Sequence, residues 1–360
     1  MMSTERPPGF SSALAAFKGF LQHLDLATPI TILCHSDADG VAAGAILYRA
    51  LQRLDFSLLT ILVTGKGANA YTPQTKQLVA STRPSALFVL DLGCLQASVL
   101  PGVPTCFIDH HRPLGVPPEG TLISSYTWQP IPNTALLVYW LCSECVSCED
   151  MLWTAAIGTL SDLGDKAPFP IIAQAKAVYK AKWLHEATAL INAGRRSASG
   201  DAETALRAIL AAQHPREIVE GASPEARKLA EYRSEVTAAL EEAKKAAPKF
   251  SGQVALVRVN SPCQIHPLIA QIWRTRLPKY IVLVGNEGYQ PGYVAFSMRT
   301  ATDVNLLDLL SGVEVDVAEG YFGYGHDQAT GGVLPIASWN QLLHHLGFSQ
   351  EVWAKTEANR

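Results

Sequence analysis

Four short segments in the first third of the chain are apolar almost throughout, and they constrain the fold more than any other feature. They are residues 29–34, 58–63, 86–92 and 105–110. Between the first two, residues 41–54 carry apolar side chains at helical spacing. Strands buried on both faces have this near-continuous apolar character, and helices between them join parallel strands. The pattern predicts an α/β fold in which a parallel sheet is flanked by helices.

The remainder of the chain divides into a helical stretch and a second β-rich block. Residues 134–247 are mostly helix-like, and residues 222–247 among them are charged, rich in alanine and without glycine. We expect a long solvated helix there, ended by Pro248. In the second block we expect strands at 254–259, 280–285 and 293–300, helices at 266–277 and 305–312, a glycine-rich turn at 320–332 and a closing helix at 337–348.

The length of 360 residues predicts two or three domains, at about 100–200 residues each. We expect an N-terminal domain at 1–221, a linker helix at 222–248 and a smaller C-terminal α/β domain at 249–360, with a cleft between the two domains.

Composition excludes several classes of protein. The 29 Lys and Arg residues against 32 Asp and Glu give a net charge of −3, which excludes a strongly basic nucleic-acid coat and an acidic tail protein. The sequence has no apolar run of about 18 residues, so we expect no contact with a membrane. The first twenty residues do not resemble a secretory signal, and we therefore interpret the seven cysteines as reduced thiols of a cytoplasmic protein.

Acidic and histidine residues gather where the apolar segments end. They are His35, Asp37 and Asp39, then Asp91, then Asp109, His110 and His111, and finally Asp162. Each segment alone has an ordinary explanation, such as a helix N-cap or a turn. Because the carboxyl ends of parallel strands share one edge of a sheet, however, we expect these segments to converge on one site.

Such a site predicts metal-dependent chemistry at phosphorus. Clustered carboxylates repel each other unless cations neutralise them, and histidine mixed with aspartate suits Mn, Fe, Zn or Co. Two metal ions about 3.5–4 Å apart, bridged by a carboxylate, form the usual clamp for displacement at phosphorus, with a water molecule as the nucleophile.

Four sequence motifs resemble those of the DHH phosphoesterase superfamily. They are HSDADG at 35–40, VLDLG at 89–93, IDHH at 108–111 and GTLSDLGD at 158–165. Near the C-terminus, GYGHDQATGG at 323–332 resembles the GGGHxxAAG loop of the DHH-associated second domain, and SMR at 297–299 resembles its SxR strand. Within the superfamily, the chain is similar to the branch that contains RecJ and the nanoRNA and pAp phosphatases.

The resemblance implies a role for each matching residue. One metal ion would be held by His35, Asp37 and Asp91, and the other by Asp39, Asp91, His110 and Asp162, so that Asp91 bridges them. His111 would stabilise charge or donate a proton at the scissile phosphate, and Asp109 would orient the histidines. The substrate-binding residues of the second domain would be Ser297, Arg299, Tyr324, Gly325 and His326. Tyr324 replaces a glycine of the family loop, where it would either hinder backbone approach to phosphate or stack on a base.

The resemblance implies a hydrolase that cleaves phosphodiester bonds of single-stranded or short oligonucleotides with two divalent ions. Manganese is the expected metal, with magnesium, cobalt and zinc as alternatives. The main alternative function is hydrolysis of pAp, linear dinucleotides or polyphosphate, and a third is an inactive scaffold, which the intact ligand set disfavours. The expected partner is a nucleic-acid or nucleotide substrate, and the choice between monomer and homodimer stays open.

Weaker signals allow two interpretations each. Lys66, Arg195, Arg196 and His266 are either substrate contacts or ordinary loop and helix-end residues. Cys142, Cys145 and Cys148 have a CxxCxxC spacing, which we interpret as small buried thiols because no fourth ligand follows closely.

Overall fold

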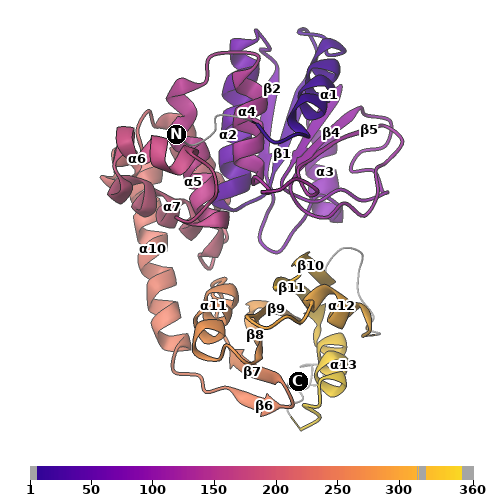
Figure 1. Ribbon diagram of the computed structural model, residues 1–360, viewed down its shortest axis with the longest axis vertical. Helices are drawn as coiled ribbons and strands as arrows, with labels where there is room; N and C mark the ends of the chain where they lie inside the picture. Colours follow the sequence, from indigo (N-terminus) through magenta and orange to yellow (C-terminus); the bar gives the residue numbers. More distant parts are fainter. Residues whose placement is uncertain (1–5, 314, 316–321, 351–360) are drawn as a thin grey trace. The chain divides into compact units, whose positions relative to one another are not determined.

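The computed structural model describes residues 6–313, 315 and 322–350, and the chain divides into two compact units (Figure 1). The first unit takes in the chain up to Arg195 together with Asp201–Arg233. The second takes in Arg196–Gly200 and the chain from Ser234 onwards. Each unit contains one sheet with its own buried core.

The sheet of the first unit has five parallel strands in the order β2-β1-β3-β4-β5. The strands are β1 (Ile30–Cys34), β2 (Leu59–Val63), β3 (Ala86–Leu90), β4 (Thr105–Asp109) and β5 (Gly120–Ser124). The sequence predicted the first four and the parallel arrangement, which the structure confirms. It missed β5, a short strand at the sheet edge that is mostly half-buried.

Helices cover both faces of this sheet (Figure 1). Alternate strand residues enter two cores, as the pleat requires: Ile32 and Phe88 face one core, whereas Leu33 and Val89 face the other. The helices of the unit are α1 (Phe10–Gln22), α2 (Ala38–Arg53), α3 (Pro73–Ser81), α4 (Thr134–Ser143), α5 (Leu152–Leu163), α6 (Ile171–Tyr179), α7 (Ala181–Arg196), α8 (Ala202–Ala211) and α9 (Pro215–Val219), with a short 3-10 turn η1 (Glu149–Met151) before α5. This layering confirms the predicted α/β class.

Helix α10 (Pro224–Ala243) passes from the first unit into the second. Most residues of the helix are exposed, as we expected of a solvated helix, but Leu229 and Val236 are buried completely or almost so. Leu229 belongs to the core of the first unit, and Val236 to a core of the second. Each end of the helix therefore packs on its own unit. None of the helices in the described part of the chain is long and apolar enough to cross a membrane.

The second unit is built on a mixed six-stranded sheet in the order β10-β11-β9-β8-β7-β6. Only β7 and β8 pair in parallel among these strands. The strands are β6 (Lys249–Ser251), β7 (Val254–Val259), β8 (Ile281–Gln290), β9 (Tyr293–Thr300), β10 (Phe322–His326) and β11 (Ala329–Pro335), and the helices are α11 (His266–Arg276), α12 (Leu306–Ser311) and α13 (Ile336–His345).

The glycine-rich segment at 320–332 is not the simple turn that we predicted. Residues 322–332 belong to the hairpin of β10 and β11, which reverses at Asp327 and Gln328, while residues 320 and 321 lie outside the described residues. Glycine is disfavoured in strands by propensity, but here it allows close approach. At Gly325, where φ is +136°, an added Cβ would lie 2.4 Å from the carbonyl oxygen of Ala329.

Candidate metal centre

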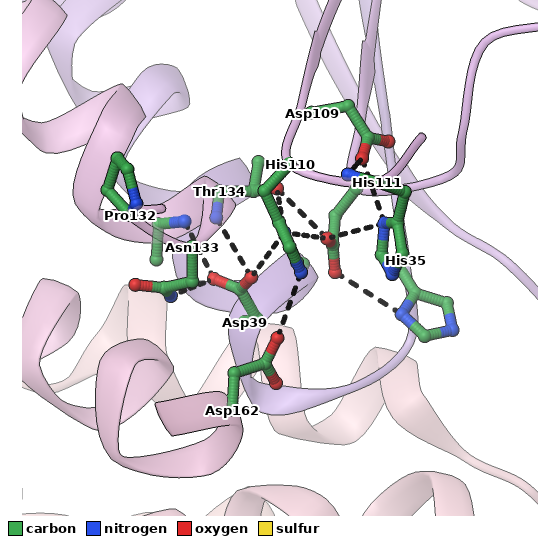
Figure 2. Close-up of polar contacts among 12 residues, drawn as sticks. His35, Asp39, Asp109, His110, His111, Pro132, Asn133, Thr134 and Asp162 are labelled. Atoms are coloured by element: carbon green, nitrogen blue, oxygen red, sulfur yellow. Dashed lines mark hydrogen bonds and ion pairs between the residues drawn. The ribbon is translucent and has the colours of Figure 1, made fainter. Parts of the chain in front are cut away.

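The ends of neighbouring strands bring the predicted ligands to one edge of the first sheet. His35 follows β1, Asp91 follows β3, and Asp109 ends β4, while Asp162 comes from α5 (Figure 2). Asp91 has a φ of +61°, in the left-handed region that residues other than glycine rarely adopt. Backbone strain of this kind is retained where the surroundings impose it, which is common at functional sites.

His35, Asp37 and Asp91 form a first group of potential ligands. The Nδ1 atom of His35 lies 3.1 Å from Oδ2 of Asp37 and 3.4 Å from Oδ2 of Asp91. Among the described residues, this buried nitrogen makes no hydrogen bond. Buried polar atoms are normally paired, so a ring nitrogen facing two carboxylate oxygens without a hydrogen bond fits a shared cation.

Asp39, His110 and Asp162 form a second group beside the first. His110 places Nδ1 3.7 Å from Oδ2 of Asp39 and Nε2 3.5 Å from Oδ2 of Asp162. Its Nδ1 also lies 3.3 Å from Oδ1 of Asp91, whose other oxygen faces His35. The two oxygens of Asp91 thus face the two groups, which is the arrangement that a bridging carboxylate needs.

The start of helix α4 holds Asp39 in place. Asp39 is fully buried, and its carboxylate accepts hydrogen bonds from the backbone N–H groups of Thr134, at 3.0 Å, and Ala135, at 2.6 Å. The side-chain amide of Asn133 donates a third, at 2.5 Å (Figure 2). Unpaired N–H groups and the helix dipole both favour a negative charge at a helix N-terminus. Asp39 is therefore fixed in orientation before any cation binds.

Asp109 holds His111 by two hydrogen bonds. Its Oδ1 accepts hydrogen bonds from the backbone N–H and from Nδ1 of His111, at 2.6 Å and 2.8 Å, and its Oδ2 accepts one from the backbone N–H of Gly93, at 2.6 Å. His110 instead contacts the hydroxyl of Thr134, at 3.1 Å. Because Nδ1 of His111 is engaged by Asp109, the ring would act on a substrate through Nε2.

The carboxylates of the cluster have opposite pKa shifts. Burial, reinforced by the charges of Asp91 and Asp162, raises the pKa of Asp39 well above its usual value. Burial and the carboxylates of Asp37 and Asp91 likewise raise the pKa of Asp162 to about 7. Without cations, these acids do not all ionise together near neutral pH.

Histidines reverse this effect at the other acids. Burial opposes the ionisation of Asp37 and Asp91, but contacts with His35 and, for Asp91, with His110 lower the pKa of both carboxyls. Burial also disfavours the charged form of His35, yet Asp37 and Asp91 overcome it and raise the pKa of His35 to about 10. The metal-free cluster thus uses histidine protons as its counter-charge, and divalent cations would replace them.

The donor set fits divalent metal ions. A ligand set of imidazole nitrogen and carboxylate oxygen suits Mn, Fe, Co or Zn, whereas Ca and Mg favour all-oxygen sites. Within each of the two groups, the ligand atoms lie within 4.8 Å of one another.

Sequence reasoning missed the residues that support the ligands. Asn133 and Thr134 begin α4 after a proline-rich loop, a pattern that indicates a helix N-terminus but not its contact with Asp39. Asn192 of α7 accepts a hydrogen bond from the backbone N–H of Ala38, at 3.3 Å, and donates one to Ser161, at 3.0 Å. Arg195, whose role was open, places Nη2 3.7 Å from Oδ2 of Asp37.

The other weak signals lie elsewhere in the molecule. Lys66 is in the loop after β2. The backbone carbonyl of Arg196 accepts a hydrogen bond from the backbone N–H of Gln264, at 2.9 Å, and both residues belong to the second unit. His266 is a buried first residue of α11. Cys142 and Cys148 are buried, and no group of potential metal ligands in the described residues includes the CxxCxxC cysteines.

The predicted substrate-binding residues of the second unit share one end of its sheet. Arg299 of β9 and His326 of β10 both pair with Ala329 of the intervening strand β11, and Ser297 pairs with Gly331. Residues paired across strands lie on the same face, and so do residues two apart along a strand. Ser297, Arg299 and His326 are therefore placed on one face of the sheet. Tyr324 and Gly325 precede His326 in strand β10.

Comparisons with known proteins agree with this architecture. Residues 29–160 match the model of the DHH family, N-terminal domain. No curated protein matches the chain by sequence. RecJ from Thermus thermophilus, solved in complex with Mn²⁺, has a similar structure, with a TM-score of 0.67 and 18% identity. The match covers 97% of this chain but 56% of that RecJ, so this chain spans little more than half of its length.

Two further solved structures are similar over nearly the whole chain. An exonuclease RecJ bound to manganese gives a TM-score of 0.59 at 18% identity, covering 98% of this chain and 97% of the other. CDC45 from Entamoeba histolytica gives 0.52 at 10% identity, covering 95% and 98%. At these identities the likeness shows a shared fold. Residues 29–160 are thus similar to the N-terminal domain of the DHH family in their sequence match, their motifs and their His/Asp cluster.

Proposed function

We propose that this protein is a metal-dependent phosphoesterase that hydrolyses phosphodiester bonds in single-stranded or short oligonucleotides. It would use two divalent metal ions, preferably manganese. The observation that carries the proposal is the pairing of two ligand groups around Asp91, whose Oδ2 lies 3.4 Å from His35 and whose Oδ1 lies 3.3 Å from His110. When bound there, two divalent ions would activate water and neutralise phosphate charge.

Residues of the chain would supply the remaining chemistry. Water attacks phosphorus, the bond from phosphorus to the sugar oxygen breaks, and that oxygen needs a proton. We assign this proton to Nε2 of His111, since Asp109 engages Nδ1 and stabilises the charged ring. Burial opposes protonation of His111, but Asp109 raises its pKa, which favours the proton-donating form near neutral pH.

A phosphate-binding role is proposed for the second unit. Arg299, with Ser297 and His326 on the same face of the sheet, would bind a substrate phosphate, because an Arg guanidinium matches two phosphate oxygens. Gly325 would let the hairpin backbone come close to the substrate. The side chain of Tyr324, for which we expected either hindrance of phosphate or stacking on a base, lies outside the described part of the structure. The near-neutral net charge of −3 favours short substrates over long strands, which are gripped by many cations.

The test is a substrate panel with the purified chain and Mn²⁺: long single-stranded DNA and RNA, oligomers of two to five nucleotides, pAp and polyphosphate. We expect nucleoside monophosphates from the oligonucleotides. Activity confined to pAp, dinucleotides or polyphosphate would instead support the small-molecule alternative, and no hydrolysis of any substrate would support the inactive scaffold.

Matched variants would tie the activity to this site. His110→Ala removes a ligand of the second group, and Asp109→Ala removes the support of His111. Asp55→Asn changes an exposed carboxylate at a positive φ that asparagine tolerates, and it serves as the control. We expect the first two variants to lose at least about 100-fold in rate, the scale of a lost acid–base group, and the control to keep its rate.

A further inference from the structure

Thr134, the first residue of helix α4, contacts both ligand groups of the metal centre. Its hydroxyl donates a hydrogen bond to Oδ1 of Asp91, at 2.9 Å, and lies 3.1 Å from Nδ1 of His110. Its backbone N–H donates to Oδ2 of Asp39, at 3.0 Å. Thr134 is fully buried, so these contacts form away from solvent (Figure 2).

Counting donors and acceptors fixes the direction of these contacts. A hydroxyl has one proton, and an ionised carboxylate accepts hydrogen bonds only. The hydroxyl proton therefore goes to Asp91, and the Thr134 oxygen can only accept from His110. The second group near Nδ1 of His110, Oδ1 of Asp91 at 3.3 Å, is also an acceptor. With these acceptors around it, and Oδ2 of Asp39 at 3.7 Å, Nδ1 carries a proton.

The other ring nitrogen of His110 is then the one that a metal ion would bind in place of a proton. Nε2 lies 3.5 Å from Oδ2 of Asp162, the second acid of its ligand group. Ligand histidines generally donate their remaining N–H to a neighbouring acceptor, which fixes the tautomer and the orientation of the ring. The hydrogen bonds from His110 Nδ1 to the Thr134 hydroxyl, and from that hydroxyl to Asp91, have this form. They also connect His110, a ligand of the second group, to Asp91, the carboxylate that faces both groups.

We propose that Thr134 is a positioning residue whose hydroxyl fixes the tautomer of His110, so that Nε2 faces the metal beside Asp162, and at the same time orients Asp91. The inference rests on the proposed metal-dependent function. Thr134 touches no substrate atom in this account, and it acts through the two ligands.

Two substitutions separate the hydroxyl from the rest of the residue. Thr134→Val keeps the branched shape and the backbone N–H that binds Asp39 but removes the hydroxyl, leaving Asp91 and His110 without their link. Thr134→Ser keeps the hydroxyl and loses one methyl group. A loss in Thr134→Val that Thr134→Ser rescues therefore belongs to the hydroxyl and not to packing, and circular dichroism would check that both variants fold.

The first readout is binding of Mn²⁺ and Zn²⁺ by calorimetry, without substrate. We expect Thr134→Val to bind about 10- to 100-fold more weakly than the wild type, the usual effect of losing a partner of a metal ligand, and Thr134→Ser to bind nearly as well as the wild type. Equal affinity of the wild type and Thr134→Val would overturn the proposal.

The second readout is the ring-nitrogen NMR signal of His110 in the zinc-loaded protein with ¹⁵N-labelled histidine, assigned through His110→Ala. We expect a proton on Nδ1 and zinc on Nε2. Zinc on Nδ1, or no zinc at His110, would contradict the proposal. Neither readout uses hydrolysis, so a protein that binds metal in this way but cleaves no substrate would refute the proposed function and leave the role of Thr134 intact.

Discussion

At the scale of single residues, the acids that suit the site for metal binding are unfavourable in the metal-free fold. Asp39 is buried and Asp162 is exposed, but both lie beside other carboxylates, and desolvation within the cluster together with these charges raises their pKa values. An acid whose pKa is higher in the folded state than in the unfolded state costs stability once the pH exceeds its unfolded value. The ligand cluster therefore lowers the stability of the metal-free protein near neutral pH and above.

The first prediction concerns Asp162→Asn in the metal-free protein. The folded pKa of Asp162 is about 7, above the ordinary value of 3.8, so the destabilisation grows between about pH 4 and pH 7 and stays constant above. Asparagine removes the charge and keeps the shape. We expect a higher melting temperature than wild type at pH 8, and a smaller difference at pH 5.

With Mn²⁺ added, the wild type should melt at a higher temperature than Asp162→Asn, because it has a charged ligand that the variant lacks. A metal-free Asp162→Asn protein that melts below the wild type by the same amount at both pH values would show that repulsion at Asp162 is not significant.

At the scale of elements, three helices approach closely around Asp39. Gly158 of α5 faces α4 and α2: a Cβ added there would lie 2.5 Å from Cβ of Ala135 and 3.2 Å from Oδ1 of Asp39. At the start of α2, a Cβ on Gly40 would lie 2.5 Å from the carbonyl oxygen of His35. Gly158 therefore allows α4 to approach Asp39 closely, and Gly40 allows the start of α2 to pack against His35.

The second prediction therefore compares two Gly→Ala substitutions in helices. Gly158→Ala should lower the free energy of unfolding by about 1–3 kcal/mol, the usual effect of overpacking, and should weaken metal binding through the displacement of Asp39. Gly19→Ala in α1 is the control, because no atom lies within 4 Å of its added Cβ. Alanine there should stabilise the helix by about 0.5–1 kcal/mol. Denaturant unfolding measures both, and equal effects at the two positions would refute the packing argument.

Sequence patterns predicted the elements whose hydrophobic signal is strong. The buried strands β1, β3 and β4 read as continuous apolar runs, and the acids at their ends followed from the geometry of parallel sheets. The edge strand β5 and the hairpin of β10 and β11 were missed because half-burial and glycine weaken the strand signal. The hydroxyl of Thr134 was missed because its partners are distant in the sequence.

At the scale of the whole molecule, the proposed metal centre belongs to one of two compact units. All six proposed metal ligands lie in the first unit, and each unit has its own buried cores. A ligand that binds only the folded state stabilises the part of the protein that holds it.

The third prediction is that calorimetric unfolding shows a transition that moves with metal and another that does not. Chelation should lower the melting temperature of the first unit, and Mn²⁺ should restore it, while the transition of the second unit stays in place. In Asp91→Asn, which weakens both ligand groups, chelation should move neither transition. A uniform shift of both transitions in the wild type would show that the metal does not act on the first unit alone.

Anomalous diffraction from a manganese-loaded crystal would locate the two metal ions that we propose to share Asp91 at this sheet edge. We expect two peaks about 3.5–4 Å apart. One should lie among His35, Asp37 and Asp91, and the other among Asp39, Asp91, His110 and Asp162. Manganese found away from Asp91, or absent from the cluster at saturating concentration, would contradict this proposal.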